Sequence, residues 1–268
     1  MNKLPQHIAI ICDGNRRWAR KKGKSEFSGH KYATDHTTEA LVNHCLKLRI
    51  PYLTFWVLST ENWKRGQTWM KQYFKLMHYF FDKKMEILTK KGAKIVTSGD
   101  LSPFPKSLQT KINQVVDQSK NNKNITINIA INYGGRDEIV RAINKLFESR
   151  SVLEVTTSRP DLKGLEFVLG PEKTAGSEPS KFQDSSDASH LRKLTSKDFQ
   201  KYLDTPTLPN PDLLIRTGEN NQRLSNFMLW QLAYTQLYFT NTLFPDFKAK
   251  ELDQAILWWQ TQTQNLGK

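Results

Sequence analysis

The chain has 268 residues, of which 38% are hydrophobic and 25% are charged, and it carries a formal net charge of +14. This is the composition of an ordinary soluble globular protein. A membrane-spanning helix requires about 18 consecutive apolar residues, and no stretch of the sequence is that long. The excess of positive charge predicts an anionic partner: a phosphorylated substrate, a nucleic acid or an acidic membrane surface.

The two cysteines and the N-terminus point to one cellular setting. Cys12 and Cys45 lie in apolar runs and match no disulfide or zinc spacing, which favours a reducing cytoplasm. Asp13 and Arg16 interrupt the only early apolar run, so we expect no signal peptide. Any contact with a membrane is therefore expected to be peripheral.

Short β-branched runs alternate with longer helical patterns along the chain. The predicted strands are 7–13, 52–59, 93–100, 125–135 and 211–218, and most are apolar at nearly every position. The predicted helices are 32–48, 66–91, 105–120, 136–148, 195–203, 226–236 and 249–263. This alternation predicts an α/β fold with a mostly parallel central sheet flanked by helices on both sides.

The first predicted strand ends in a polar cluster followed by basic residues. Asp13, Gly14 and Asn15 follow the apolar run, and a helix is expected to start near Arg16. A helix N-terminus binds phosphate well, Arg17 would add a forked donor, and Asp13 fits among them if it holds a magnesium ion shared with a diphosphate. The alternative is a helix cap followed by a solvated basic face, and this stretch alone favours neither.

The predicted helix 66–91 carries two apolar stripes where one core-facing stripe would be enough. The helix is either buried on two sides or lines a long apolar cavity, and periodicity alone favours burial. The stripes are Met70, Phe74, Met77, Phe81, Met85, Leu88 and, beside them, Trp69, Tyr73, Leu76, Phe80, Ile87.

Residues 150–190 break the rhythm because they are rich in Ser, Pro, Lys and Asp and show little periodicity. We interpret them as a surface insertion in a single domain that spans 1–268. The functional alternative is a lid or a partner-binding loop.

A second phosphate-type cluster, RTGENNQRLSN, occupies residues 216–226 after the last predicted strand. Arg216, Arg223 and Ser225 could surround a diphosphate, with Asn226 opening the next helix. Two such sites, one carboxylate and an apolar stripe predict an enzyme on which two phosphorylated substrates meet, at least one of them with a long hydrocarbon.

Seven stretches give the chain a family resemblance. It resembles the cis-prenyltransferases, the family of undecaprenyl diphosphate synthase and dehydrodolichyl diphosphate synthase, over nearly its whole length except 150–190. The stretches are HIAIICDGNRRWA, GHK at 29–31, LSTENWKR at 58–65, SGDLSPFP at 98–105, NIAINYGGRDEIVRAI at 128–143, PDLLIRTG at 211–218 and QRLSNFMLWQLAYTQLYFTNTLFPDF at 222–247.

The resemblance implies a parallel sheet flanked by helices, with an elongated hydrophobic tunnel. The enzyme would condense isopentenyl diphosphate onto an allylic diphosphate such as farnesyl diphosphate, with Mg²⁺ as cofactor, and make the polyprenyl diphosphate precursor of a carrier lipid. It would be a homodimer in the cytoplasm, with possible peripheral contact at the inner membrane face, and we expect no nucleic-acid partner.

The resemblance also assigns roles to individual residues. Asp13 would hold the metal and assist diphosphate departure, and Asn15 would position a group or take up a proton. Substrate-binding roles fall to Gly14, Arg17, Trp18 and His30 for the allylic diphosphate, to Ser59, Glu61, Asn62, Trp63 and Arg65 in a mobile loop, and to Arg216, Arg223 and Ser225 for isopentenyl diphosphate. Phe74, Met77 and Phe81 would wall the tunnel, which reverses the preference for a simply buried helix.

The chain departs from the family pattern at several positions. Gln236 stands where bacterial members commonly carry a glutamate that helps to hold the metal, and Glu26 stands at an often basic position. The loop between Arg216 and Arg223 is one residue longer than usual. Three alternatives therefore stay open: a member with a short or unusual product, a regulatory subunit without catalysis, and a basic nucleic-acid-binding protein.

Overall fold

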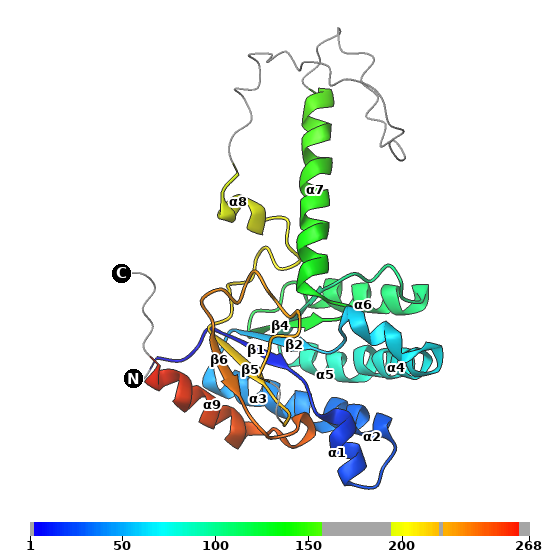
Figure 1. Cartoon of the computed structure of the whole chain (residues 1–268), viewed down its shortest axis with the longest axis vertical. Helices are drawn as coiled ribbons and strands as arrows, with labels where there is room; N and C mark the ends of the chain where they lie inside the picture. The colour runs from blue at the N-terminus through cyan, green and yellow to red at the C-terminus, as the bar shows by residue number, and fades with distance from the viewer. Residues whose placement is uncertain (1–2, 157–193, 220–221, 263–268) are drawn as a thin grey trace, which may run out of the picture.

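A computed structural model describes residues 3–156, 194–219 and 222–262. Its centre is a parallel β-sheet with the strand order β3-β4-β2-β1-β5-β6 (Figure 1). The strands are β1 (His7–Ile11), β2 (Tyr52–Trp56), β3 (Ala93–Ser98), β4 (Ile125–Ala130), β5 (Leu213–Arg216) and β6 (Gln236–Phe239). All five predicted strands are confirmed, and β6 is an additional strand.

The helices surround this sheet and join into longer helical segments. They are α1 (Asn15–Lys21), α2 (Glu26–Tyr32), α3 (Thr38–Leu48), α4 (Gln67–Tyr79), α5 (Met85–Lys90), α6 (Lys106–Ser119), α7 (Gly135–Thr156), α8 (Ser196–Gln200) and α9 (Ala249–Thr261). π-Helical turns Ala33–Thr37 and Phe80–Lys84 connect α2 to α3 and α4 to α5, and Thr60–Arg65 and Phe244–Asp246 are short 3₁₀ helices. The predicted helix 66–91 is thus one helical segment with an internal π turn.

The prediction of a helix at 226–236 is wrong. Ser225, Asn226 and Met228 have φ angles of 49°, 70° and 43°, in the left-handed region that a right-handed helix excludes. Turns follow, and β6 begins at Gln236. The apolar side chains that suggested a helix, Phe227 and Met228 among them, are buried against the sheet instead.

The two faces of the sheet are covered differently. Alternate strand residues such as Ile8 and Ile10 face a large core formed with α3, α4, α5, α6 and α9. Their neighbours Ala9 and Ile11 face a smaller cluster that includes Phe227 from the segment 224–232. Because both faces are covered, the strands read as continuous apolar runs.

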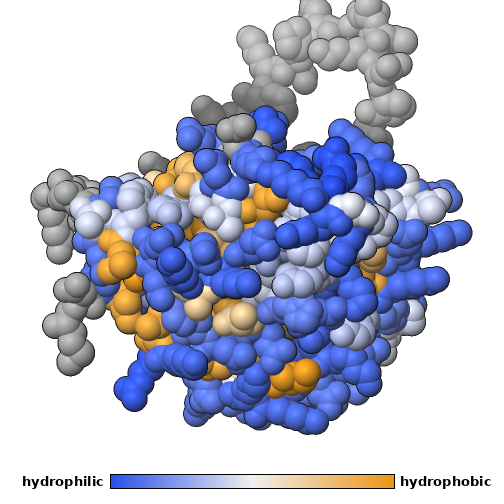
Figure 2. All heavy atoms as spheres, turned by 90° about the horizontal axis from the view of Figure 1, so that it is seen from below, coloured by the Kyte–Doolittle hydropathy of each residue, from blue (hydrophilic) through white to orange (hydrophobic). Residues whose placement is uncertain are grey.

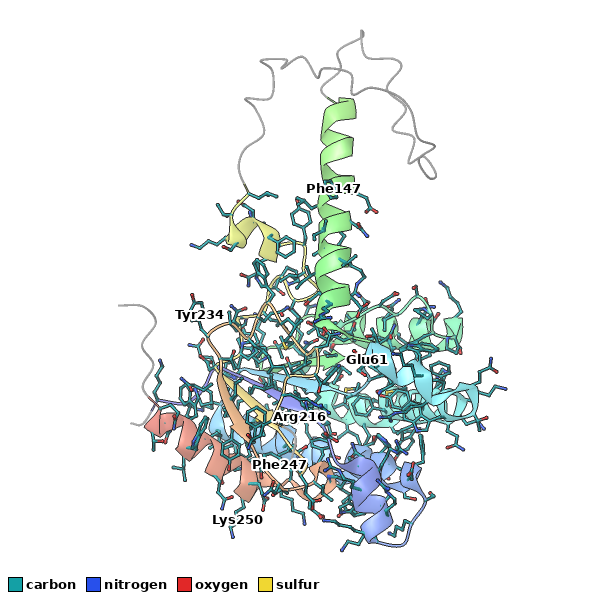
Figure 3. The ribbon with its side chains drawn as sticks, in the orientation of Figure 1. Glu61, Phe147, Arg216, Tyr234, Phe247 and Lys250 are labelled. Carbon is teal, nitrogen blue, oxygen red and sulfur yellow. The ribbon has the colours of Figure 1, made fainter. Side chains whose placement is uncertain are left out.

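Helix α7 rises away from the sheet beside α8 (Figure 1). It continues through Thr156, so the predicted insertion starts inside a helix, and residues 157–190 lie outside the described residues. Val140, Ile143 and Phe147 form an exposed apolar stripe on α7, with 57%, 38% and 64% of their surface accessible. Figure 3 shows Phe147 on the raised part of the helix.

The outer surface is mainly hydrophilic. The face in Figure 2 is mostly blue, with separate apolar patches between long polar side chains. Among the described residues, no helix combines the length and the apolarity needed to cross a membrane.

Candidate active site

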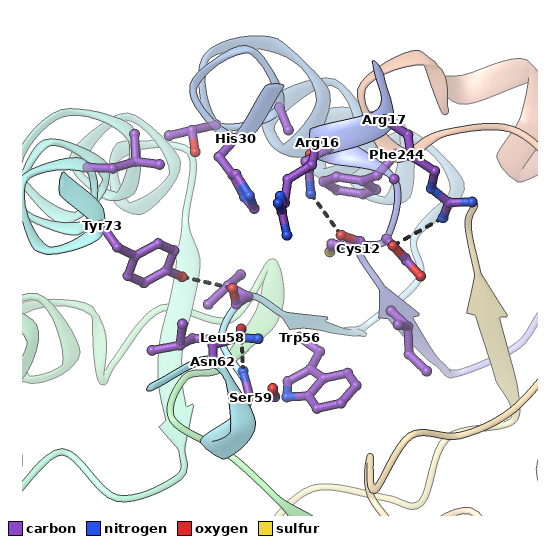
Figure 4. Close-up of a pocket in the computed structure, with 18 of the residues that line it drawn as sticks. Cys12, Arg16, Arg17, His30, Trp56, Leu58, Ser59, Asn62, Tyr73 and Phe244 are labelled. Atoms are coloured by element: carbon purple, nitrogen blue, oxygen red, sulfur yellow. Dashed lines mark hydrogen bonds and ion pairs between the residues drawn. The ribbon is translucent and has the colours of Figure 1, made fainter. Parts of the chain in front are cut away.

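A cavity of about 610 Å³ opens where β1, β2 and β5 end, in contact with α1, α2 and α4 (Figure 4). Sites of parallel sheets form at this edge because the loops that follow the strands diverge there. Eleven predicted site residues line it: Asp13, Gly14, Asn15, Arg17, His30, Ser59, Asn62, Arg65, Met77, Arg216 and Ser225. The cavity thus joins segments that lie far apart in the sequence, from Ile11 to Phe244.

The Asp13 carboxylate lies between two guanidinium groups. Arg17 Nη2 is 3.3 Å from Asp13 Oδ1, and Arg216 Nη2 is 3.1 Å from Asp13 Oδ2. Gly218, at φ 103°, allows this approach, because a Cβ there would lie 2.6 Å from Arg17 Nη2. Asp13 is therefore the counter-ion of two arginines that could instead bind a phosphate.

Arg216 is almost completely buried, with 5% of its surface accessible. Its Nη1 donates to Ser225 Oγ at 2.8 Å and to the Arg223 carbonyl, while Nε is buried without a partner. Arg223 thus contributes its carbonyl oxygen here, whereas its exposed side chain is not part of the cavity wall. A buried guanidinium with an unused N–H group is suited to an anionic ligand.

Asn15 begins α1 and also keeps an unused polar atom. Its Nδ2 donates to the Cys12 carbonyl at 2.8 Å, whereas Oδ1 is buried without a partner. α1 and α2 touch at this point, since a Cβ on Gly29 would lie 1.9 Å from the Asn15 carbonyl oxygen. Only glycine at 29 permits that approach, which brings His30 to the cavity wall.

His30 and Arg65 meet over the ring of Trp69. Arg65 Cζ lies 4.6 Å from the Trp69 ring centroid, and the His30 ring packs edge-on to Trp69 at 5.9 Å. Burial, followed by the nearby charges of Arg65 and Arg16, lowers the pKa of His30 to about 4. His30 Nε2 is buried without a partner. An arriving anion would offset the positive field that keeps this imidazole neutral.

The other part of the cavity wall is apolar. Leu76 and Met77 of α4, Phe80 and Phe244 line it, with Ala33 from the π turn after α2. Of the three predicted tunnel residues only Met77 is in this wall. Phe74 packs on Trp63 and Phe104, and Phe81 is fully buried in the core. The cavity is therefore lined mainly by the second stripe, through Tyr73, Leu76 and Phe80, and the first stripe contributes only Met77.

Besides Arg223, three predicted substrate-binding residues lie outside the cavity wall. Trp18 stacks on Tyr32 and donates to Asp246 Oδ1 at 2.9 Å. Trp63 donates to Asn132 Oδ1 at 2.7 Å, and Glu61 accepts a hydrogen bond from Asn226 at 3.3 Å. All three connect the segments around the site.

Sequence reasoning missed several lining residues. Arg16 and Arg20, one turn apart on α1, bring further positive charge, and Glu26 binds the Arg16 guanidinium at 2.6 Å. The signal was the spacing of the basic run, which places both arginines on one helical face. The remaining missed polar or aromatic lining residues are Thr34, Thr38, Trp56, Tyr73 and Glu219.

Gln236 requires a correction. It starts β6 opposite Leu213, whereas Phe239, at the end of β6, is opposite Arg216. At roughly 3.3 Å per residue, Gln236 is about 10 Å further down the sheet than Arg216 and is not part of the cavity wall. Within one chain, Gln236 therefore does not take the place of a second metal ligand beside Asp13.

Comparisons with known proteins agree with one another. Residues 11–267 match the family model described as "Putative undecaprenyl diphosphate synthase". The chain is 36% identical to an isoprenyl transferase of Leptospira interrogans over 99% of this chain and 96% of that one. It is 35% identical to an isoprenyl transferase of Aquifex aeolicus over 99% and 97%.

Two solved structures are similar along the whole chain. One is lavandulyl diphosphate synthase from Lavandula x intermedia in complex with dimethylallyl diphosphate, with a TM-score of 0.79, 30% identity and 99% coverage of both chains. The other is a probable undecaprenyl diphosphate synthase from Campylobacter jejuni, with a TM-score of 0.71, 28% identity and 100% coverage of both chains.

Proposed function

We propose a specific reaction for this chain, which belongs to the undecaprenyl diphosphate synthase family of prenyltransferases. It adds isopentenyl diphosphate units to an allylic diphosphate such as farnesyl diphosphate. The chain is a prenyltransferase that elongates isoprenyl chains. The observation that supports this choice of substrates is the two-part cavity, with arginines beside Asp13 and an apolar wall from α4. This arrangement suits a diphosphate with a hydrocarbon tail.

The allylic diphosphate would sit near Asn15, Arg17 and His30. The amide, the guanidinium and the imidazole come from α1 and α2, and all three line the cavity. Of the unused polar atoms, His30 Nε2 could donate to a diphosphate oxygen in the tautomer that protonates it, whereas Asn15 Oδ1 is an acceptor and could take a hydrogen bond only from a protonated group or a water. Isopentenyl diphosphate would take Arg216 and Ser225, which are already joined by a hydrogen bond.

In the reaction, the allylic C–O bond breaks and the diphosphate leaves with the electron pair. Arg17 and neighbouring guanidinium groups would stabilise the negative charge that develops on the leaving group. The double bond of isopentenyl diphosphate then supplies the electrons of the new C–C bond, and a proton leaves the adjacent carbon. Holding both substrates in line accounts for much of the acceleration, since no covalent enzyme intermediate is needed.

The residues present fit a magnesium ion that is shared with substrate. No group of three His, Cys, Asp or Glu side chains in the described ranges could hold a metal alone. Mg²⁺ commonly takes one or two carboxylates together with substrate phosphates and water, and Asp13 and Glu219 are the carboxylates of the cavity wall. Asp13 would hold the ion, which when bound would add positive charge at the departing diphosphate.

The structural similarity to lavandulyl diphosphate synthase supports a second candidate, a member with a short or unusual product. That relative was solved with dimethylallyl diphosphate, a smaller allylic substrate than farnesyl diphosphate. Both candidates use the same cavity and the same leaving-group chemistry. They differ in the preferred primer and in how many isopentenyl units are added.

The exposed stripe of Val140, Ile143 and Phe147 on α7 supports assembly as a homodimer. An apolar helix face of this size is normally covered by a partner. We place the enzyme in the cytoplasm, and we expect the net charge of +14 to favour peripheral contact with anionic lipids at the inner membrane face.

The decisive experiment is incubation with labelled isopentenyl diphosphate and Mg²⁺, with farnesyl diphosphate in one arm and dimethylallyl diphosphate in the other, followed by chromatography. Long polyprenyl products in the farnesyl arm would support the first candidate. One-unit or branched products in the dimethylallyl arm would support the second. Absence of any labelled prenyl product in both arms would refute the proposed function, and a chelator control checks the metal.

A further inference from the structure

Asn226 joins three segments next to the cavity: the loop that carries Ser225, the N-terminus of α7 and the 3₁₀ helix Thr60–Arg65. Its Oδ1 accepts from the backbone N–H of Arg136 at 2.9 Å, and its backbone carbonyl accepts from the N–H of Gly135. Its Nδ2 donates to Glu61 Oε1 at 3.3 Å. Asn226 thus ties its own loop to α7 with two hydrogen bonds and to the 3₁₀ helix with one.

The chemistry of the partners fixes the orientation of this amide. The Arg136 N–H group can only donate and therefore requires the Asn226 oxygen. The Glu61 carboxylate only accepts, so it requires the Asn226 NH₂ group. Asparagine satisfies both neighbours at once, whereas aspartate would keep the first bond and repel Glu61.

The backbone at this point is strained and tightly packed. Ser225 and Asn226 both have positive φ, which is costly for residues other than glycine. A Cβ on Gly134 would lie 2.8 Å from both Asn226 Nδ2 and Thr60 Oγ1, so the segments meet only because glycine is there. Strain of this kind persists where the surroundings hold it and is concentrated at functional sites.

The two segments that Asn226 joins serve different substrates under the proposed function. Ser225 holds the Arg216 guanidinium at 2.8 Å, on the side assigned to isopentenyl diphosphate. The 3₁₀ helix begins after Ser59 and carries Asn62 and Arg65, which both line the cavity, and Arg65 lies near His30 because both contact the Trp69 ring. A shift of the 3₁₀ helix would therefore move the loop that carries Ser225, and the reverse, through the hydrogen bond between Glu61 and Asn226.

We infer that Asn226 is a positioning residue that couples the two diphosphate sites through its hydrogen bond to Glu61. Neither side chain lines the cavity, so their effect passes through the segments they hold. Ordering of the 3₁₀ helix by the allylic diphosphate would also fix the Ser225 loop, so that isopentenyl diphosphate binds more tightly afterwards. This inference rests on the proposed assignment of the two substrates.

The test measures the affinity for isopentenyl diphosphate by calorimetry, with and without farnesyl thiodiphosphate, an unreactive analogue of the allylic substrate. In the wild-type protein the analogue should tighten isopentenyl diphosphate binding by about three- to tenfold, the scale of one hydrogen bond. Asn226→Asp should abolish that tightening. Its melting temperature should be retained, because the acceptor for Arg136 remains and a negative charge suits the start of α7.

Two double variants separate the hydrogen bond from net charge. Glu61→Gln with Asn226→Asp has the wild-type charge and restores a donor–acceptor pair with reversed polarity, so the tightening should return. Glu61→Ala with Asn226→Asp has the same charge but no donor at position 61, and the tightening should stay absent.

Retained tightening in Asn226→Asp, or equal behaviour of the two double variants, would overturn the inference while leaving the proposed function intact. The same conclusion would follow if the analogue failed to tighten binding in a wild-type protein that turns over both substrates. A wild-type protein that bound neither diphosphate would overturn the proposed function and this inference with it.

Discussion

Two histidines, His7 and His30, occupy different ends of the molecule and have similar electrostatics. His7 starts β1, far from the cavity, while His30 lies in the cavity wall. Burial is the main cause that lowers the pKa of each to about 4. Their hydrogen bonding differs: His7 Nδ1 donates to the Pro209 carbonyl and Thr54 donates to His7 Nε2, both at 2.7 Å, whereas His30 Nε2 has no partner.

The difference separates a structural role from a ligand-binding role. Burial of a polar group costs free energy unless a hydrogen bond compensates. His7 is compensated inside the protein and needs nothing further. At the cavity, Asn15 Oδ1 and Arg216 Nε share the unpartnered state of His30, and under the proposed function a bound ligand or water would supply their missing partners.

The largest expected effect concerns the cavity end. Asp13→Ala should lower turnover at least about 10²-fold, because it removes the carboxylate assigned to the metal and the leaving group. The melting temperature should fall as well, because the variant leaves the buried Arg216 guanidinium without its counter-ion, so turnover is compared per amount of folded protein. Steady-state kinetics and a thermal melt check this, with Asp117→Ala, an exposed carboxylate of α6 outside the cavity wall, as the control. Near-normal turnover would refute the role of Asp13.

The free energy of unfolding should decrease at acidic pH because His7 is buried in its neutral form. Its pKa lies at about 4 in the folded chain against 6.5 ordinarily, so between these values the unfolded chain binds more protons. Stability is therefore highest above pH 6.5 and falls as the pH approaches 4, by roughly 3 kcal/mol from this residue. Urea unfolding at several pH values measures this loss. His7→Ala should show a shallower slope, and an unchanged slope would contradict the assignment.

Substitution of the two histidines should give opposite results. His7→Ala removes the hydrogen bond to the Pro209 carbonyl and the acceptor of the Thr54 O–H, so it should cost about 1–3 kcal/mol of stability and leave KM unchanged. His30→Ala should raise KM for the allylic diphosphate about tenfold with little loss of stability. An equal rise in KM for His7→Ala and His30→Ala would contradict the conclusion that only His30 has a ligand-binding role.

Within helix α4 and the π turn that follows it, Met77 and Phe81 sharpen the same distinction. Met77 lines the cavity and Phe81 is fully buried in the core. Met77→Phe should shorten the product distribution without a large loss of stability. Phe81→Ala should cost about 3–5 kcal/mol while changing chain length less. Chromatography of products and denaturant unfolding distinguish the two, and a product shift only in Phe81→Ala would reverse the assignment.

The smallest expected effect is at Gln236. Gln236 lies at the start of β6, at the end of the sheet where His7 begins β1 and opposite to the end that carries the cavity. If the metal is held by residues of one chain, Gln236→Glu should leave the Mg²⁺ concentration for half-maximal activity unchanged. A metal titration of both proteins measures this. A clear shift of the midpoint would place Gln236 near the metal, through a partner subunit if not within the chain.

The sequence was a good guide wherever local pattern and tertiary position agreed. Strands buried on both faces read as continuous apolar runs, and the polar residues that follow β1, β2 and β5 meet at one cavity. Helix 226–236 failed because positive φ angles at Ser225 and Asn226 depend on contacts with α7, which no local pattern encodes. The sequence could not distinguish Met77, which lines the cavity, from Phe74 and Phe81, which pack in the protein interior. Periodicity shows which residues share a helix face, but it does not show which part of the protein packs against that face.

The position of Asp13 between Arg17 and Arg216 has a consequence for the order of events. In the empty enzyme this aspartate acts as an internal placeholder, which keeps two like-charged guanidinium groups side by side at fixed positions. Under the proposed function, an incoming diphosphate would displace the placeholder and meet arginines whose conformational freedom was already lost when the chain folded. The displaced carboxylate would then be available to hold a cation that the diphosphate also binds.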